Sequence, residues 1–163
     1  MRAAALLLVL LAAGCAPAGL RPGATPAPFE ARLLPGGTLR LDQLAGSVVL
    51  LDVWATWCVP CRSALPGYAR LARELPGLRV VALSIDQGDD EVRRFLAEVP
   101  LPVLIARDPG GVLAEGLGVR AMPTAFVLDR AGQVRLREDG LGPGAEERVE
   151  AAVRALLAEP AVR

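Results

Sequence analysis

The feature that most constrains the fold of this chain is a nearly unbroken apolar run, Ser47–Trp54, which reads SVVLLDVW. Such a run predicts a strand buried on both faces of a sheet, because a half-exposed strand would alternate apolar and polar residues. A sheet with two covered faces needs helices on both sides, so we expect an α/β fold. The one charged residue in the run is Asp52, which the same pattern places in the interior.

Strand and helix patterns alternate along the rest of the chain. The last predicted strand alternates apolar and polar residues, as expected at the edge of a sheet with one solvated face. Apolar runs predict strands at 29–34, 38–41, 78–85, 102–105, 124–129 and 133–138, and apolar residues at helical spacing predict helices at 61–75, 89–99, 112–117 and 145–157. These elements predict one layered α/β domain over residues 28–163.

The first 14 residues have the order of a secretory signal. Arg2 precedes an apolar run over 3–13 that is too short to span a bilayer. The run leads into LAAGC, which resembles a bacterial lipobox and makes Cys15 the expected lipidated residue. We therefore expect an exported protein, a bacterial lipoprotein anchored to the membrane and facing the periplasm. Ordinary cleavage farther on, after residues 16–18, is the alternative.

The segment that follows the predicted signal is rich in proline and glycine. Residues 15–27 contain almost no apolar side chain that could start a core. This composition predicts a flexible tether, with the folded domain beginning near Pro28.

Composition excludes several kinds of chemistry. The chain has no His, and all of its 18 basic residues are Arg. Imidazole-based acid–base catalysis, His metal ligands and lysine Schiff bases are therefore excluded. The 18 acidic residues balance the charge, so no net field favours nucleic acid. Thiols, carboxyl groups and backbone groups remain for any chemistry.

Cys58 and Cys61 form a C-x-x-C motif, CVPC, which is compatible with several kinds of site. A structural zinc site needs four ligands, and this chain offers too few. A structural staple is disfavoured, because so local a bridge closes too small a loop to restrict the unfolded chain. Two thiolates bind Cu(I), so a Cu(I)-binding lipoprotein stays open as an alternative. We favour a reversible redox disulfide.

The two cysteines are expected to differ in environment. Cys58 lies between the buried strand and a helix, so its sulfur should face unpaired helix N–H groups that stabilise a thiolate. Pro60 fits the first helical turn, where its missing N–H costs nothing. Cys61 lies one turn further and should be more buried. We therefore predict that Cys58 attacks and Cys61 resolves.

Asp52 lies six residues before Cys58 on the buried strand. A buried carboxylate without a partner is costly, so the group should stay protonated or find a partner. We predict a carboxyl group of raised pKa that accepts the proton of Cys61. The alternative is an Asp at the strand end that points to solvent.

The segment DVWATWCVPC resembles the active-site segment of the thioredoxin superfamily. The match consists of the cysteine pair, Asp52 six positions before the first cysteine, and Trp54 and Trp57 four and one before it. Pro66, five residues after Cys61, matches the helix-kinking proline of that family. The resemblance implies a thioredoxin fold with a central mixed β-sheet flanked by helices.

The segment VRAMPT over 119–124 resembles the cis-proline loop of the same family. It implies a cis peptide bond before Pro123, whereas an ordinary turn proline is the alternative. In the family this loop lies beside the cysteine pair and binds the partner's chain as an added strand. The resemblance therefore makes Met122, Pro123 and Trp57 substrate-contact residues. Met122 as core filler stays open.

The long spacing between Cys58 and Pro123 resembles the TlpA/ResA-like branch, in which a βα unit is inserted, here around 89–117. An N-terminal β-hairpin is also typical of that branch. Thr124 and Val59 stand where members of the branch that act in cytochrome c maturation carry Glu. Those two positions depart from the pattern of that pathway.

The resemblance implies a thiol–disulfide oxidoreductase that reduces disulfides in partner proteins, such as apocytochrome c or copper-site proteins. It also implies a membrane electron donor of the DsbD/CcdA kind, since no nucleotide-binding motif and no cofactor site are present. A net oxidant that introduces disulfides stays open, because direction depends on the reduction potential. A peroxiredoxin carries Thr or Ser three positions before its cysteine, where this chain has Ala55.

Overall fold

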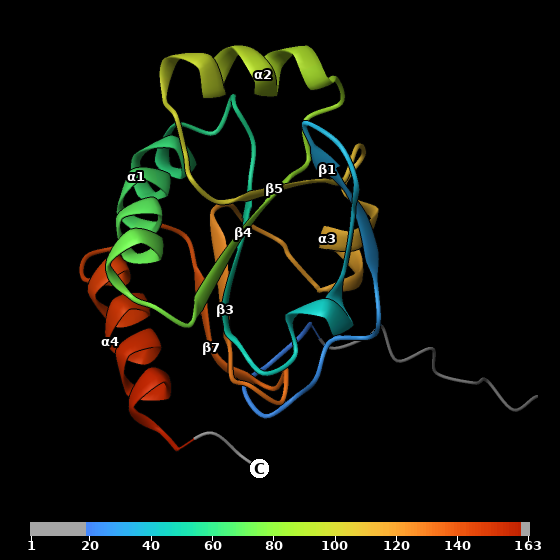
Figure 1. Cartoon of the computed structure of the whole chain (residues 1–163). Coiled ribbons are helices and arrows are strands. Elements are labelled where there is room, and N and C mark those ends of the chain that lie inside the picture. The colour runs from blue at the N-terminus through green and yellow to red at the C-terminus, as the bar shows by residue number, and fades with distance from the viewer. Residues whose placement is uncertain (1–18, 161–163) are drawn as a thin grey trace, which may run out of the picture.

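The computed structural model describes residues 19–160 (Figure 1). The predicted signal sequence and Cys15 lie outside the described residues. Within 19–160, no helix is both long and apolar enough to cross a membrane.

A seven-stranded mixed sheet forms the centre of the molecule, with the strand order β2-β1-β5-β4-β3-β6-β7. The pairs β3–β4 and β4–β5 are parallel, and the other four pairs of neighbouring strands are antiparallel. The strands are β1 (Glu30–Leu34), β2 (Thr38–Arg40), β3 (Val48–Trp54), β4 (Leu78–Ser84), β5 (Leu104–Arg107), β6 (Thr124–Leu128) and β7 (Val134–Asp139). The helices are α1 (Val59–Glu74), α2 (Asp89–Glu98), α3 (Val112–Gly116), α4 (Ala145–Ala158) and the short 3₁₀ helix η1 (Leu41–Leu44). The expected α/β fold and the edge position of β7 are confirmed.

Helices cover both faces of the sheet. Figure 1 shows α1 and α4 on one face, α3 and η1 on the other, and α2 across the end of the sheet. The inserted unit is thus α2 with β5, and β1 with β2 is the N-terminal hairpin.

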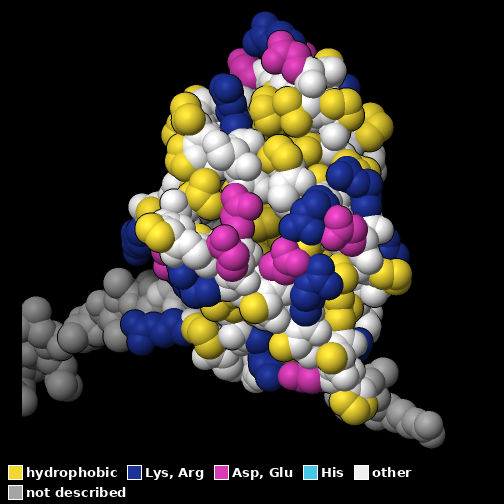
Figure 2. Space-filling model, turned by 90° about the vertical axis from the view of Figure 1, so that its left-hand side faces the viewer, with side chains coloured by type: hydrophobic (Ala, Val, Ile, Leu, Met, Phe, Trp, Pro, Cys, Tyr) yellow, Lys and Arg dark blue, Asp and Glu magenta, His cyan; other side chains and the backbone are white. Residues whose placement is uncertain are grey.

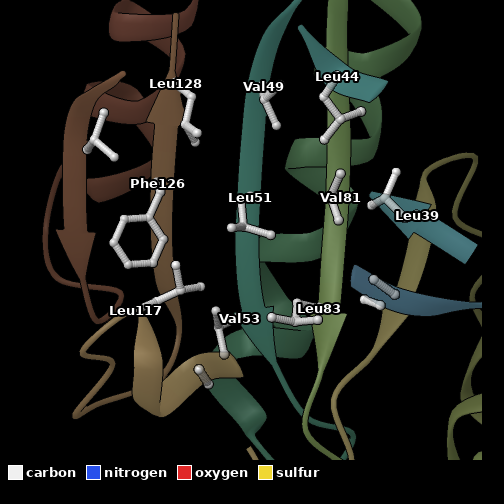
Figure 3. Close-up of a cluster of buried hydrophobic side chains, with 14 residues drawn as sticks. Leu39, Leu44, Val49, Leu51, Val53, Val81, Leu83, Leu117, Phe126 and Leu128 are labelled. Carbon is white, nitrogen blue, oxygen red and sulfur yellow. The ribbon is translucent and has the colours of Figure 1, made fainter. Parts of the chain in front are cut away.

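The central strand β3 is buried along its whole length, as its apolar run predicts. Alternation along the strand sends Val49, Leu51 and Val53 into the cluster beneath η1 and α3 (Figure 3). Val48 and Leu50 belong to the cluster beneath α1 and α4. The same alternation directs Asp52 toward the face that α1 covers.

Charged side chains are interspersed over the outside of α1 and α4, as Figure 2 shows. Arg70 pairs with Glu74 of its own helix at 2.7 Å and with Glu150 of α4 at 2.8 Å. Exposed pairs of this kind contribute at most about 1 kcal/mol each. The buried cluster beneath the two helices therefore holds them to the sheet.

Two predicted boundaries differ from the observed ones. Strand β5 begins at Leu104, two residues later than predicted, because Pro102 has no N–H to donate and the Val103 N–H instead closes a turn onto the Leu101 carbonyl at 2.8 Å. Helix α1 begins at Val59, two residues earlier than predicted, because Cys58 itself is the N-cap residue.

The prediction of a flexible tether over 15–27 is wrong for its described part. The N–H of Leu20 donates to the Leu117 carbonyl at 3.1 Å, and the N–H of Gly23 donates to the Val134 carbonyl at 2.8 Å. The Val134 N–H returns a hydrogen bond to the Ala24 carbonyl at 2.9 Å. These long-range backbone bonds hold the segment against the domain, although its composition contains little to seed a core.

Candidate active site

Cys58 and Cys61 are joined by a disulfide at the N-terminus of α1. The Cys58 sulfur accepts a hydrogen bond from the Cys61 N–H at 3.3 Å. Cys58 is 6% exposed, whereas Cys61 is completely buried. The predicted difference in burial is confirmed, and the accessible sulfur is the one that caps the helix.

The start of α1 creates this arrangement. Cys58 has an extended backbone, and its own N–H donates to the Ala55 carbonyl at 3.1 Å, closing a turn after β3. Pro60 occupies the first turn, where a helix has no acceptor for a backbone N–H. The N–H groups and the helix dipole would stabilise negative charge on the Cys58 sulfur.

Asp52 is completely buried, and neither of its carboxyl oxygens has a hydrogen-bond partner among the described residues. Its neighbours across the ladders are Ala82 of β4 and Ala125 of β6. Burial alone raises the pKa of the Asp52 carboxyl well above its ordinary value. The structure therefore contradicts the alternative of a solvent-facing Asp and supports a buried carboxyl group of raised pKa.

Asp52 and the cysteines lie in the same part of the interior. Ala82, the cross-strand neighbour of Asp52, packs in one cluster with Cys58, Cys61 and Trp54. Trp54 is fully buried and stacks at a tilt on Phe95 of α2, with ring centroids 5.2 Å apart. This contact agrees with a packing role for Trp54.

The predicted cis-proline loop lies beside the cysteine cluster. The Met122–Pro123 peptide bond is cis, as predicted. Met122 is half-buried and packs against the cluster that contains Cys58 and Cys61. Met122 therefore contributes to the core beside the cysteines, and its contact with substrate stays a prediction.

Two grooves flank the disulfide. One of about 460 Å³ lies between α1 and α2 and is lined by Val59, Pro66, Phe95 and Val99 among others. The other, of about 490 Å³, borders the cis-proline loop and includes Met122. Trp57 and Val59 are the large exposed apolar side chains next to Cys58, at 65% and 66% exposure. These two exposed apolar side chains therefore adjoin the disulfide. A contact of Trp57 with substrate stays a prediction.

A polar group next to the cysteines was not predicted from the sequence. The Asp86 carboxylate accepts hydrogen bonds from the backbone and hydroxyl of Thr56, two residues before Cys58. Asp86 lies two residues after the end of β4, which runs parallel to β3. The ends of parallel strands meet at one edge of a sheet, and that position was the available signal.

No group of three or more Cys, Asp or Glu side chains suited to a metal occurs within residues 19–160. Cys58 and Cys61 are the only cysteines in that part of the chain.

Comparison with known proteins agrees with this geometry. Residues 22–137 match the model of the AhpC/TSA family. A thiol-disulfide oxidoreductase ResA from Bacillus thuringiensis subsp. konkukian is 33% identical over 103 residues. That match covers 62% of this chain and 60% of the relative, so it spans less than two thirds of the relative's length.

Solved structures show the same fold. A protein from Chlorobium tepidum, described as a thiol:disulfide interchange protein DsbE, superimposes with a TM-score of 0.79 at 36% identity, over 86% of this chain and all of that one. The exposed lipoprotein thioredoxin Etrx1 from Streptococcus pneumoniae strain TIGR4 gives 0.69 at 26% identity, over 80% of this chain and all of that one. This chain therefore has a thioredoxin-like fold and belongs to the AhpC/TSA family.

Proposed function

We propose that this protein is an exported thiol–disulfide oxidoreductase that reduces disulfides in partner proteins through Cys58 and Cys61. The observation that carries the proposal is the disulfide at the N-terminus of α1, with its Cys58 sulfur accepting the Cys61 N–H. That environment favours a thiolate on the accessible cysteine. The ResA and DsbE relatives are named for the same chemistry.

In the first step, the reduced pair attacks a partner. The Cys58 thiolate attacks one sulfur of the partner's disulfide, forms a mixed disulfide and releases the other sulfur as a thiolate. Cys58 is the attacking residue because Cys61 is completely buried.

In the second step, Cys61 resolves the mixed disulfide. Its thiol passes a proton to the Asp52 carboxylate, and the thiolate then attacks the Cys58 sulfur. The partner leaves with its second thiolate, so two electrons have moved to it and the Cys58–Cys61 disulfide is restored. The raised pKa of Asp52 suits this exchange, because a base works best when its pKa approaches that of the proton donor.

A dithiol donor must then return two electrons to the pair. A membrane carrier of the DsbD/CcdA kind is the donor we propose, on the ground of family resemblance. Apocytochrome c and the cysteines of copper sites are candidate partners on the same ground. Met122, Pro123 and Trp57, which lie around the cysteine pair, are proposed to contact the partner's chain.

Trapping tests the roles of the two cysteines. Cys58→Ser should abolish reduction of insulin disulfides, whereas Cys61→Ser should accumulate a mixed disulfide through Cys58 that dithiothreitol releases. Full reductase activity in Cys58→Ser would end the proposal. Arg73→Ala, an exposed change near the far end of the same helix, should leave the activity unchanged.

The reduction potential of the pair tests the direction of electron flow. A value near about −270 mV, as in thioredoxin, would support a reductant. A value near about −120 mV, as in DsbA, would instead identify an oxidant. Equilibration with glutathione buffers of known potential gives this value.

We also propose that Cys15 anchors the protein to a membrane through a lipid. The support is the LAAGC motif and the likeness to a thioredoxin described as an exposed lipoprotein. Expression with labelled palmitate should label the parent protein but not Cys15→Ala. Absence of label in the parent would refute the anchor without affecting the redox proposal.

A further inference from the structure

A buried polar network supports the turn that carries Cys58. The carboxylate of Asp86, which is 3% exposed, accepts the Thr56 N–H on both oxygens at 3.2 and 3.0 Å. It also accepts the Thr56 hydroxyl at 2.6 Å and the Ser84 hydroxyl at 2.8 Å. Asp86 therefore binds both the backbone and the side chain of Thr56.

Arg107 of β5 fixes Asp86 from the other side. Its side chain is completely buried and donates to the carbonyls of Asp86 and Gly88 at 2.8 and 2.7 Å. It also donates to the Ser84 hydroxyl and pairs with Asp89 at 2.9 Å. The inserted unit of α2 and β5 thus holds the loop that bears Asp86.

Thr56 lies inside the turn that places the redox sulfur. The Cys58 N–H closes this turn onto the Ala55 carbonyl at 3.1 Å. Cys58 then caps α1, with its sulfur 3.3 Å from the Cys61 nitrogen. A shift of Thr56 would therefore move the Cys58 sulfur relative to the N–H groups that favour its negative charge.

We propose that Asp86 is a positioning residue for the redox pair: it holds Thr56, so that Cys58 Sγ stays over the N-terminus of α1. This inference rests on the proposed function, because it assigns to Cys58 the role of attacking thiolate. Asp86 acts through Thr56, and Arg107 in turn keeps Asp86 in place.

Two effects of Asp86 on Cys58 have opposite signs. A carboxylate near the thiol disfavours the thiolate by repulsion, so its removal would lower the pKa of Cys58. A carboxylate that holds the sulfur over the helix N-terminus favours the thiolate, so its removal would raise that pKa. We expect positioning to dominate, because the Asp86 carboxylate is bound directly to the backbone N–H and hydroxyl of Thr56, inside the turn that precedes Cys58.

The test measures the thiol of Cys58 directly, in a Cys61→Ser background. The rate of alkylation by iodoacetamide is followed against pH, with and without Asp86→Ala. We expect Asp86→Ala to raise the pKa of Cys58 by about half to one unit, which slows alkylation about three- to tenfold below that pKa. An unchanged or lowered pKa would overturn the proposal.

Two further variants make the result specific. Thr56→Val removes the hydroxyl donor and keeps the backbone bond, so it should move the pKa in the same direction by a smaller amount. Thr56→Val also keeps the proposal testable if Asp86→Ala does not fold. In that case, an unchanged Cys58 pKa in Thr56→Val would overturn the proposal. Asp108→Ala is the matched control, because Asp108 is equally buried but binds the N–H groups of Leu113 and Ala114 at the start of α3. It should leave the pKa of Cys58 unchanged.

Alkylation needs no partner protein, so this result is independent of insulin reduction. A parent protein that fails to reduce insulin would contradict the proposed function. A Cys58 pKa that does not respond to Asp86 would contradict the positioning role alone.

Discussion

Asp52 lies directly across the parallel β3–β4 ladder from Ala82, so the neighbour of the buried carboxyl group is a methyl group and not a cation. Ala125 occupies the corresponding place on β6. Nothing within the described residues hydrogen-bonds to the carboxyl oxygens, and burial raises the pKa of Asp52 well above its ordinary value.

This environment predicts a cost to stability that increases with pH. Burial raises the pKa of Asp52, so the folded protein keeps a proton that the unfolded chain releases above about pH 4. Between about pH 4 and the pKa of Asp52 in the folded protein, the unfolding free energy of Asp52→Asn should therefore rise relative to that of the parent. The rise should be about 1.4 kcal/mol per pH unit. Urea unfolding of the oxidised protein at pH 4.5, 5.5 and 6.5 measures the difference.

Asp42 provides the control for this measurement. It is exposed, and its hydrogen bonds with Arg40 lower its pKa, so its contribution to stability is lost as pH falls below about 4. Asp42→Asn should show no growing difference between pH 4.5 and 6.5. A flat difference for Asp52→Asn as well would contradict the raised pKa.

Loss of the Asp52 carboxyl group should also slow resolution of the mixed disulfide. When the reduced protein reacts with an aromatic disulfide, Cys58 releases the first chromophore and Cys61 the second. Asp52→Asn should slow the second release about 100-fold or more near neutral pH, because Cys61 loses its base. Stopped-flow absorbance resolves the two steps. Equal second-phase rates in parent and variant would remove Asp52 from the proton transfer.

Gly118 should be essential for docking of the N-terminal segment. Its φ is +72°, and a Cβ at this position would lie 2.2 Å from the Gly19 Cα. Gly118→Ala should displace the segment and expose residues 19–24 to cleavage by subtilisin, located by mass spectrometry. Gly132 has a φ of +79°, and a Cβ added there would meet no atom within 4 Å, so Gly132→Ala isolates the backbone cost of about 1–2 kcal/mol. Increased cleavage at residues 19–24 in both variants would refute a specific contact.

Phe95 should link the inserted helix to the active-site core. Phe95→Ala removes the ring that packs on Trp54 and should lower the unfolding free energy by about 2–3 kcal/mol, less than for a fully buried Phe. Near-ultraviolet circular dichroism should show a weaker Trp signal. Arg94→Ala, an exposed change on the same helix, should change neither quantity. Parent-like stability of Phe95→Ala would show that α2 is held elsewhere.

Features that depend on local pattern were predictable. The run SVVLLDVW predicts a doubly buried strand, and β3 is buried at every position. Pro60 fits a first helical turn, and in the structure it lies in the first turn of α1. Each of these depends on the chemistry of a few adjacent residues, which the sequence displays directly.

Features that depend on distant residues were not predictable. Thr56 and Asp86 are 30 positions apart, and Asp86 and Arg107 meet through the pairing of β4 with β5. The described part of the predicted tether is likewise held by the backbones of Leu117 and Val134. Composition indicates how readily a segment starts a core. It does not indicate which remote carbonyls accept the N–H groups of that segment.

By itself, the sequence determined that a cysteine pair follows a buried strand that contains a carboxyl group, in a chain without His or Lys. The tertiary structure decided that this carboxyl group has alanine neighbours and no partner among the described residues, and that Asp86 supports the turn before Cys58. The physical reason is strand register. Register sets which side chains stand opposite each other across a sheet, and it arises from packing of the whole domain.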